Sequence, residues 1–279
     1  RLDILRVKRS LIGYTNKLSS VKNSFGGSMY MDYARTAATY DHPGGKWVLN
    51  SLSVNDGFLG DGDSLLSRFA YTDGRYDRYE RAFLGFSDVI TEYVNTAETS
   101  LPIYKKLYQT FDNSNYYTRG ALLSTELKGV AGEVEKLYTS TVNEYHAYAV
   151  NRKAHGETAD LGKYQLESIN PSTDLDRVNH FLQQHIVYTP IKYTKNVLYD
   201  VANQSSVTTS EEHYAYHTAI GTHGELSTYT FSDKGTLGAS GTGGFNYKTS
   251  INYLRNNPSM TLFSLPEDVV VTGSDNTIY

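Results

Sequence analysis

The chain has 279 residues, with 26 Lys and Arg against 30 Asp and Glu, which gives a formal net charge of −4. This balance argues against a nucleic-acid partner bound by phosphate neutralisation. The absence of cysteine excludes disulfides and thiolate zinc sites, and no run reaches the roughly 18 apolar residues of a membrane span. Tyrosine, with 25 residues, is the compositional outlier. It favours an all-β fold, because a tyrosine ring packs on a sheet while its hydroxyl reaches water or a partner.

The order of β-rich runs along the chain predicts an all-β protein built from successive hairpins. The first 14 residues alternate charged and apolar side chains, so we interpret them as a strand in a fragment of a longer protein rather than a signal peptide. Turn residues follow the second and third of the later runs, at Asn55-Asp56-Gly57 and Thr72-Asp73-Gly74. The predicted strands cover residues 28–33, 47–54, 67–71, 140–150, 185–201, 213–220, 227–231, 245–254 and 268–273.

One segment departs from the β pattern and predicts a short helix near residues 173–185. Its apolar residues fall at helical spacing, and Ser172 or Thr173 can cap its first turn. Those apolar residues are Leu175, Val178, Phe181 and Leu182. The polar residues 151–171 before it are expected to form a long loop.

An internal repeat supports the hairpin architecture. The pattern Leu-Ser-Ser/Thr, then six further residues and a glycine, occurs at Leu18–Gly27, Leu123–Gly132 and Leu226–Gly235. Each copy predicts a strand that enters a glycine turn and returns, less clearly so in the third copy.

The densest group of charges lies at residues 73–81, directly before the apolar run 82–86. Asp77 and Glu80 are a candidate carboxylate pair of the kind that glycosidases use. However, Arg75, Arg78 and Arg81 stand beside them, and an arginine neighbour lowers the pKa of a carboxyl and makes it a poor general acid. We therefore interpret the stretch as a turn at Asp73-Gly74 with a structural ion-pair network, anchored by two phenylalanines.

Three other segments are weaker candidates for chemistry. Asp56, Asp61 and Asp63 form a glycine-rich acidic loop that does not match the calcium-loop template, so calcium binding stays open. His213 and His217 lie four residues apart in a predicted strand, where they are too far apart for one metal ion. The glycine-rich run 235–247 lacks the Lys-Ser/Thr of a phosphate loop. We therefore predict no catalytic residue, no cofactor and no metal site.

Residues 71–89, YTDGRYDRYERAFLGFSDV, resemble a signature of the Rhs/YD-repeat shell proteins, in particular the middle region of SpvB-like proteins and of the B component of insecticidal toxin complexes. Residues 16–57 resemble the same family upstream, and residues 116–127 and 264–279 do so more loosely. The sequence departs from the signature at Arg75 and Ala82. The matching residues are Tyr71, Gly74, Tyr76, Asp77, Glu80, Arg81, Phe83, Gly85, Phe86 and Val89.

The resemblance implies a fold, a role and a set of partners. Residues 1–279 would form a single segment of an extended curved antiparallel sheet, part of a non-enzymatic β-cocoon that encapsulates a toxin or effector polypeptide. Partners would be the remainder of the same polypeptide, its enclosed C-terminal effector and other toxin-complex subunits, in a secreted or cell-surface bacterial protein. Two alternatives remain open at this point. One is a β-sandwich module that binds carbohydrate or protein through exposed tyrosines, and the other is a glycosidase fragment that uses Asp77 or Glu80.

Overall fold

The computed structural model describes residues 16–57, 64–152, 164–169, 187–218, 224–234, 246–254 and 265–273, all of them strands or connections between strands. Thirteen strands form one sheet: β1 (Ser20–Lys22), β2 (Ser28–Arg35), β3 (Trp47–Asn55), β4 (Ser64–Asp77), β5 (Ala82–Val94), β6 (Ile103–Asp112), β7 (Ala121–Ala131), β8 (Val134–Tyr145), β12 (Ile191–Tyr199), β13 (Ser206–Tyr216), β14 (Leu226–Asp233), β15 (Asn246–Tyr253) and β16 (Pro266–Gly273). Three more strands form a small second sheet: β9 (Tyr148–Arg152), β10 (Tyr164–Ser168) and β11 (Val187–Tyr188).

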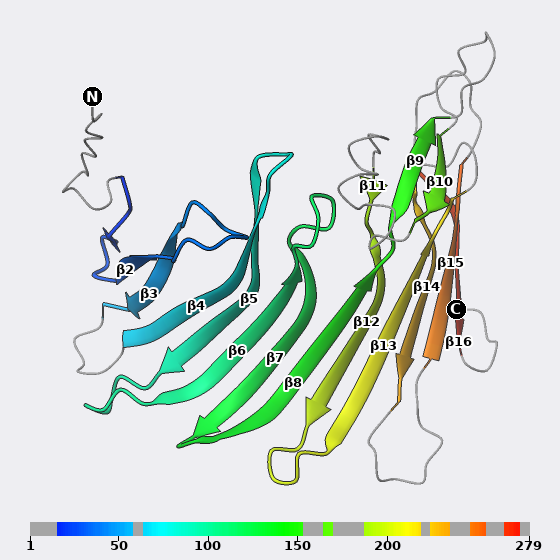
Figure 1. The fold of residues 1–279 in the computed structure, drawn as a ribbon. Coiled ribbons are helices and arrows are strands. Elements are labelled where there is room, and N and C mark those ends of the chain that lie inside the picture. The colour runs from blue at the N-terminus through cyan, green and yellow to red at the C-terminus, as the bar shows by residue number, and fades with distance from the viewer. Residues whose placement is uncertain are drawn as a thin grey trace, which may run out of the picture.

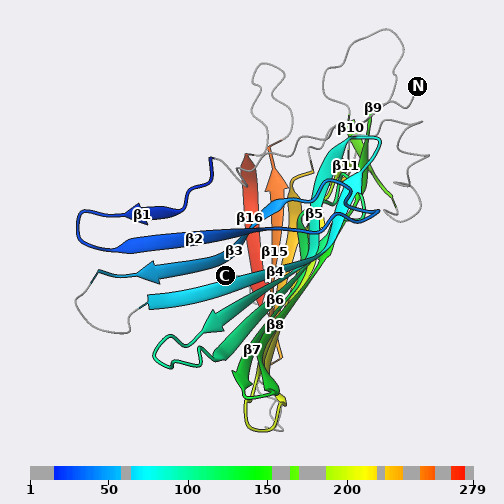
Figure 2. The same ribbon diagram turned by 60° about the vertical axis from the view of Figure 1, so that its left-hand side comes forward.

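The large sheet is antiparallel throughout and does not close on itself. Each strand pairs with the next in sequence, except that β8 pairs with β12 across the insertion of the small sheet. Figure 1 shows the strands following one another from β2 to β16, with the small sheet beyond one end of β8 and β12. In Figure 2 the strands turn from nearly horizontal in β1–β4 to nearly vertical in β15 and β16. This rotation is the right-handed twist of paired strands accumulated over thirteen of them.

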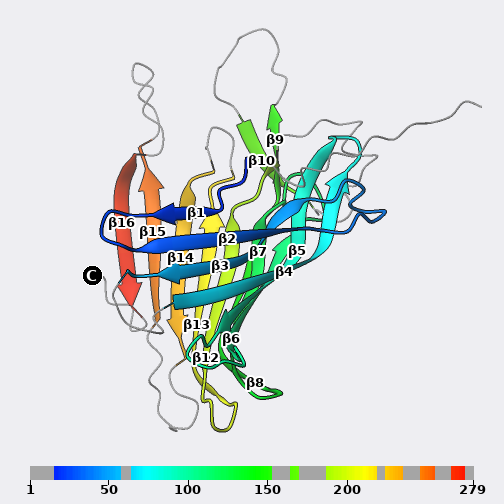
Figure 3. The same ribbon diagram turned by 90° about the vertical axis from the view of Figure 1, so that its left-hand side faces the viewer.

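The expected all-β, curved antiparallel sheet of successive hairpins is confirmed. The sheet is open at β1 and at β16 among the described residues, as Figure 3 shows from the side of β1. The alternative of a β-sandwich is wrong, because the thirteen strands form one continuous layer instead of two stacked sheets. The predicted helix at 173–185 lies outside the described residues.

Most predicted strands appear, but two long runs are broken. The predicted run 185–201 is divided between β11 of the small sheet and β12 of the large sheet. Residues 140–150 read as a single strand in the sequence, whereas β8 ends at Tyr145 and β9 begins at Tyr148. Between them, His146 N donates to Pro190 O, and Ala147 O accepts from Ile169 N. These backbone bonds lead the chain out of the large sheet into the small one, so a tertiary contact overrides the continuous β-forming pattern.

Two copies of the repeat are confirmed as hairpins. Leu18–Gly27 covers β1 and its turn into β2, and Leu123–Gly132 covers most of β7 and its turn into β8. The third copy begins in β14, and its proposed return at residues 236–240 lies outside the described residues.

A single-layer sheet buries few side chains completely. The buried apolar residues of the described chain are Leu84 and Val94 in β5, together with Ala147, Tyr148 and Ala149. Two well-packed regions result. One lies around the end of the β4–β5 hairpin, and the other lies where the small sheet meets the large one, with Tyr148, Tyr188, Tyr216 and His146 in ring contact.

Candidate functional site

The signature residues 71–86 form the far end of the β4–β5 hairpin. The expected turn at Asp73-Gly74 is wrong: β4 continues through these residues to Asp77, and the chain turns at residues 78–81. The carboxylate Oδ1 of Asp77 accepts hydrogen bonds from the backbone N of Tyr79 (2.8 Å) and of Glu80 (3.1 Å). This is an Asx-type turn, in which a short acidic side chain replaces a backbone acceptor. The position of Asp77 is therefore explained by turn formation and not by a paired acid.

A bulge in β5 explains the motif glycine at position 85. Arg75 pairs with Gly85 and Tyr76 with Phe83, so Leu84 is the extra residue. Gly85 has φ +132°, and a Cβ there would lie 2.9 Å from both side-chain polar atoms of Asn113. The Asn113 side chain is buried and bridges two elements, since it donates to Phe86 O (2.8 Å) and accepts from Gly120 N (2.9 Å). Only glycine allows Asn113 to approach β5 this closely.

The aromatic residues of the signature enclose a histidine from a distant loop. We call His42, Tyr71, Gly74, Phe83 and Phe86 the hairpin cluster. The His42 ring centroid lies 4.7 Å from that of Phe83 and 5.8 Å from that of Phe86, and the Tyr71 and Phe86 centroids are 5.2 Å apart. A Cβ at Gly74 would lie 3.0 Å from Phe86 and 3.2 Å from the His42 ring, so a side chain there would separate the two rings. The second motif glycine is thus also required by packing.

Burial sets the protonation of the hairpin cluster. His42 is 3 % exposed, and its burial, with Lys46 nearby, lowers its pKa. Its Nε2 lies 3.5 Å from Thr36 Oγ1, whereas Nδ1 has no hydrogen-bond partner. Burial likewise raises the pKa of Tyr71. Both rings are therefore kept neutral at pH 7.

The expected ion-pair network in residues 73–81 is only partly visible. Arg75 pairs with Asp73 at 3.2 Å, at an exposed position. Arg78 instead stacks over the Tyr40 ring, 4.3 Å from its centroid, and donates to Tyr40 O at 2.9 Å. It thereby ties the hairpin turn to the loop that carries His42. Sequence reasoning missed His42 and Asn113, because neither lies near the signature in the chain.

The two faces of the large sheet differ in chemistry, and strand register defines them. Glu92, Lys106 and Lys128 are opposite one another across β5, β6 and β7, so they share a face, which we call the charged face. Lys106 pairs there with Glu92 (3.5 Å) and Glu135 (3.0 Å). Burial opposes ionisation of Glu135, but the hydrogen bonds from Lys106 and Tyr108 outweigh it and hold the pKa of the carboxyl below its usual value.

The charged face continues into the C-terminal strands. Lys195 of β12 lies opposite Glu211 of β13, and Glu211 also accepts from Lys234 at 2.7 Å. The hydrogen bond from Lys234 lowers the pKa of Glu211. Half-exposed pairs of this kind stabilise a sheet modestly, each by about 0.2–1 kcal/mol.

The opposite face carries threonines and aromatic rings, and we call it the threonine–aromatic face. In its C-terminal part, Glu212 accepts hydrogen bonds from Tyr214 (2.6 Å) and Tyr229 (3.0 Å). Burial and the bond to Glu212 raise the pKa of Tyr214. Ring contacts carry the cluster on to β15, where Tyr247 stacks on Phe231. A row of opposed residues on this face crosses six strands: Val89, Gln109, Thr125, Thr141, Asn196 and Ser210.

The threonine–aromatic face is the more covered of the two in β15. In β15, Tyr247, Thr249 and Ile251 on this face are half-buried, whereas Asn246, Lys248 and Asn252 on the charged face are exposed. Side chains on the concave side of a curved sheet converge and shield one another, and those on the convex side separate. The burial pattern therefore favours the threonine–aromatic face as the concave one.

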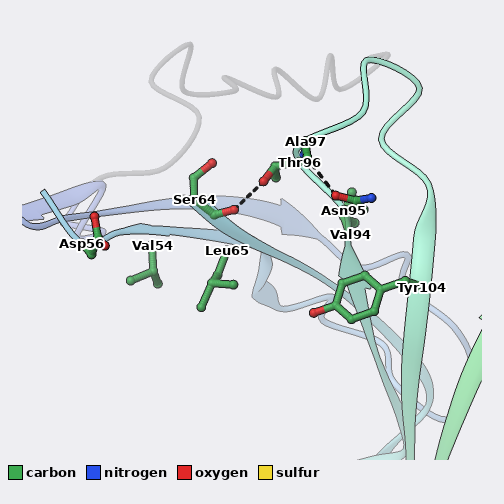
Figure 4. A pocket seen from close by; sticks show the side chains of 9 residues that line it. All are labelled: Val54, Asp56, Ser64, Leu65, Val94, Asn95, Thr96, Ala97 and Tyr104. Carbon is green, nitrogen blue, oxygen red and sulfur yellow. Dashed lines mark hydrogen bonds between the residues drawn. The ribbon is translucent and has the colours of Figure 1, made fainter. Parts of the chain in front are cut away.

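A shallow cavity of about 580 Å³ lies near the ends of β3, β4, β5 and β6 (Figure 4). Val54, Leu65 and Tyr104 supply its apolar wall. Its polar groups already have partners: Thr96 Oγ1 donates to Ser64 O at 2.6 Å, and Asn95 bonds to Glu98 and to Ala97 N. The cavity thus offers few free polar groups with which to orient a substrate.

The remaining candidate residues do not come together as a site. His213 packs against the Tyr193 ring, while His217 lies 3.2 Å from Ile251 O. Asp56 is exposed next to the cavity, and Asp61 and Asp63 lie outside the described residues. No group of three or more His, Asp or Glu side chains in the described part of the chain could hold a metal ion. No described helix is long and apolar enough to cross a membrane.

The described residues thus form an open, single-layer antiparallel sheet with two chemically different faces. Comparison with known proteins identifies which structure it resembles. Residues 5–112 match the family described as "Insecticide toxin TcdB middle/N-terminal region". The resemblance to the middle region of the insecticidal toxin-complex B component is thereby confirmed. No curated protein matches the chain.

Solved structures of toxin complexes share the fold. The chain resembles the structure of TcdB2-TccC3-Cdc42 with a TM-score of 0.63 and 11% identity over 94% of this chain. It resembles TcdB2-TccC3 with a TM-score of 0.62 and 11% identity over 91%. It also resembles the Tc holotoxin pore of Photorhabdus luminescens, which carries a TccC3 mutation, with a TM-score of 0.64 and 10% identity over 89%. The chain spans 14–15% of the length of these proteins.

Proposed function

We propose that this chain is a structural wall segment of a bacterial toxin-complex shell that encloses an effector polypeptide, and that it performs no catalysis. The observation that carries the proposal is the open, curved, thirteen-stranded sheet, whose two edge strands β1 and β16 have an unpaired side among the described residues. An unpaired edge in so large a sheet is an aggregation liability unless further strands cover it. Pairing with the remainder of a longer polypeptide would satisfy both edges.

The two faces suit the two sides of a wall. The charged face carries paired lysines and glutamates that remain compatible with water, as an outer surface requires. The threonine–aromatic face is the more covered one and would line the lumen. Its hydroxyls and rings offer few charges to bind any one cargo sequence tightly. Such a lining would tolerate different enclosed polypeptides.

The finer parts of the proposal rest on sequence resemblance. They are the Rhs/YD-repeat and SpvB-like relationship, secretion or cell-surface location, a single unit over residues 1–279, and partnership with a C-terminal effector and other toxin-complex subunits. Of these, only the partnership with other toxin-complex subunits has support from the matched structures, whose printed names pair TcdB2 with TccC3.

Single cysteines on the two faces test the proposal directly, because the chain has none of its own. Lys248 and Thr249 are adjacent in β15 and point to opposite faces. In the assembled full-length protein, a Lys248→Cys variant should react with a bulky maleimide, while a Thr249→Cys variant should be protected at least tenfold. In the 279-residue chain alone, both should react. Equal labelling of the two variants in the assembled protein would refute a closed wall with this orientation.

A protease assay tests encapsulation itself. The full-length protein with its effector would be digested in parallel with the separated effector, and the effector should survive only when enclosed. Digestion at the same rate in both samples would exclude the shell role.

A further inference from the structure

The hairpin cluster contains a buried group that can respond to acid. His42 lies in residues 36–46, which connect β2 to β3 and which we call the latch. The ends of the latch are joined by the bond from Thr36 N to Lys46 O (2.8 Å). Inside it, Thr39 and His42 exchange two bonds, from Thr39 N to His42 O (2.9 Å) and from His42 N to Thr39 Oγ1 (3.0 Å). This backbone holds the imidazole against Gly74, Phe83 and Phe86 of the β4–β5 hairpin.

The surroundings accept a neutral imidazole but not a charged one. A neutral ring with its proton on Nε2 can donate to Thr36 Oγ1, and it leaves only a lone pair on Nδ1. Protonation would place a second N–H on Nδ1, which has no acceptor and is sealed from water. A buried donor without a partner, carrying a positive charge, is one of the least favourable groups a protein interior can hold.

Burial and the positive charge of Lys46 both disfavour a protonated His42 ring. The latch itself contributes Asp41 and Lys46, and Lys46 Nζ lies 5.3 Å from the centre of the Phe83 ring that covers His42. The end of β2 contributes Arg35, which donates to Gly44 O of the latch. On the hairpin side, β4 contributes the pair Asp73–Arg75, and the turn contributes Arg78 over Tyr40. The part of β5 in contact with the ring offers only Phe83 and Phe86.

We propose that residues 36–46 are an acid-released latch, in which protonation of His42 detaches the loop from the end of the β4–β5 hairpin. The latch links four consecutive strands of the sheet, since it runs from β2 to β3 and packs on β4 and β5. Its release would free this end of the sheet to move while the strand ladders stay paired. Acidification would thus loosen one rim of the sheet without unfolding it.

The direction of the pH effect follows from linkage. The pKa of His42 is lower in the folded protein than its ordinary value of 6.5, because burial disfavours the charged form. The contribution of neutral His42 to holding the latch on the hairpin is therefore complete above about pH 6.5, and it is lost as the pH falls below that value.

A spin label at an exposed latch residue reports the release. An Ala38→Cys variant of the full chain provides the single labelling site, and Glu133→Cys in the exposed β7–β8 turn is the matched control. We expect the mobility of the label at position 38 to rise severalfold between pH 7.5 and pH 5, with that at position 133 unchanged. A latch label that stays immobile to pH 5, or equal gains at both positions, would overturn the proposal.

Replacing the sensor separates His42 from general acid effects. In the Ala38→Cys background, His42→Phe keeps an aromatic ring and cannot be protonated, so the acid transition should disappear. His42→Gln is the second variant, should the phenylalanine not be accommodated, and it should also abolish the transition. His213→Gln removes an exposed histidine instead and should leave the midpoint unchanged. An unchanged transition in both His42 variants would show that another group is the sensor.

Discussion

Replacement of Gly85 by alanine tests whether the signature glycine is required by packing. The backbone at φ +132° disfavours any side chain, at about 1–3 kcal/mol. The new Cβ would also displace the Asn113 side chain and break its bonds to Phe86 O and from Gly120 N, at about 1 kcal/mol each. Together these effects predict a loss of about 3–5 kcal/mol in the free energy of unfolding.

Urea unfolding followed by the fluorescence of Trp47, the only tryptophan of the chain, measures this loss. Gly132→Ala is the matched control, because Gly132 also has a positive φ (65°) but nothing lies within 4 Å of its Cβ position. Its free energy of unfolding should fall only by the cost of the strained backbone, about 1–2 kcal/mol. An Asn113→Ala background should remove the difference between the two glycine variants. Equal losses in the two variants, or full additivity of Gly85→Ala with Asn113→Ala, would refute the reasoning.

Three further predictions concern single side chains. Asp77→Ala should lower the free energy of unfolding by about 1 kcal/mol in a thermal unfolding experiment, because two backbone donors lose their acceptor. Asp77→Asn keeps an acceptor oxygen and should retain most of the stability. An Asp77→Asn variant as unstable as Asp77→Ala would contradict the turn role. Glu135→Gln should lower the melting temperature measurably at low salt and much less in 1 M salt, because Lys106 and Lys128 lose a shared half-buried partner; a salt-independent loss would contradict this. Burial raises the pKa of Tyr216 to about 12, so the free energy of unfolding should fall as the pH rises from 10 to 12. Tyr216→Phe should reduce that fall in a series of unfolding measurements at alkaline pH. An unchanged alkaline transition would show that Tyr216 does not contribute.

The chemistry of the signature stretch shows how local and tertiary information differ. Its charges suggested an ion-pair network, and its Asp73-Gly74 dipeptide suggested a turn. Both predictions use only residues that are neighbours in the sequence. In the structure, Gly74 lies inside a strand because His42, from a loop about thirty residues earlier, needs the space beside Phe86. The acid Asp77 caps the real turn four residues later. A dipeptide favours a turn only when no distant side chain packs against it.

The sequence by itself determined the fold class, since tyrosine content, alternating strands and glycine turns are local properties that each hairpin repeats. The residues of 71–89 were also enough to indicate the toxin-complex resemblance. Only the tertiary structure decided which residues meet. The bulge at Leu84, the clamp by Asn113, the burial of His42 and the exit of the chain at His146 all depend on contacts between segments far apart in the sequence. Such contacts are set by how neighbouring strands and loops pack in space, which the order of polar and apolar residues along one strand does not encode.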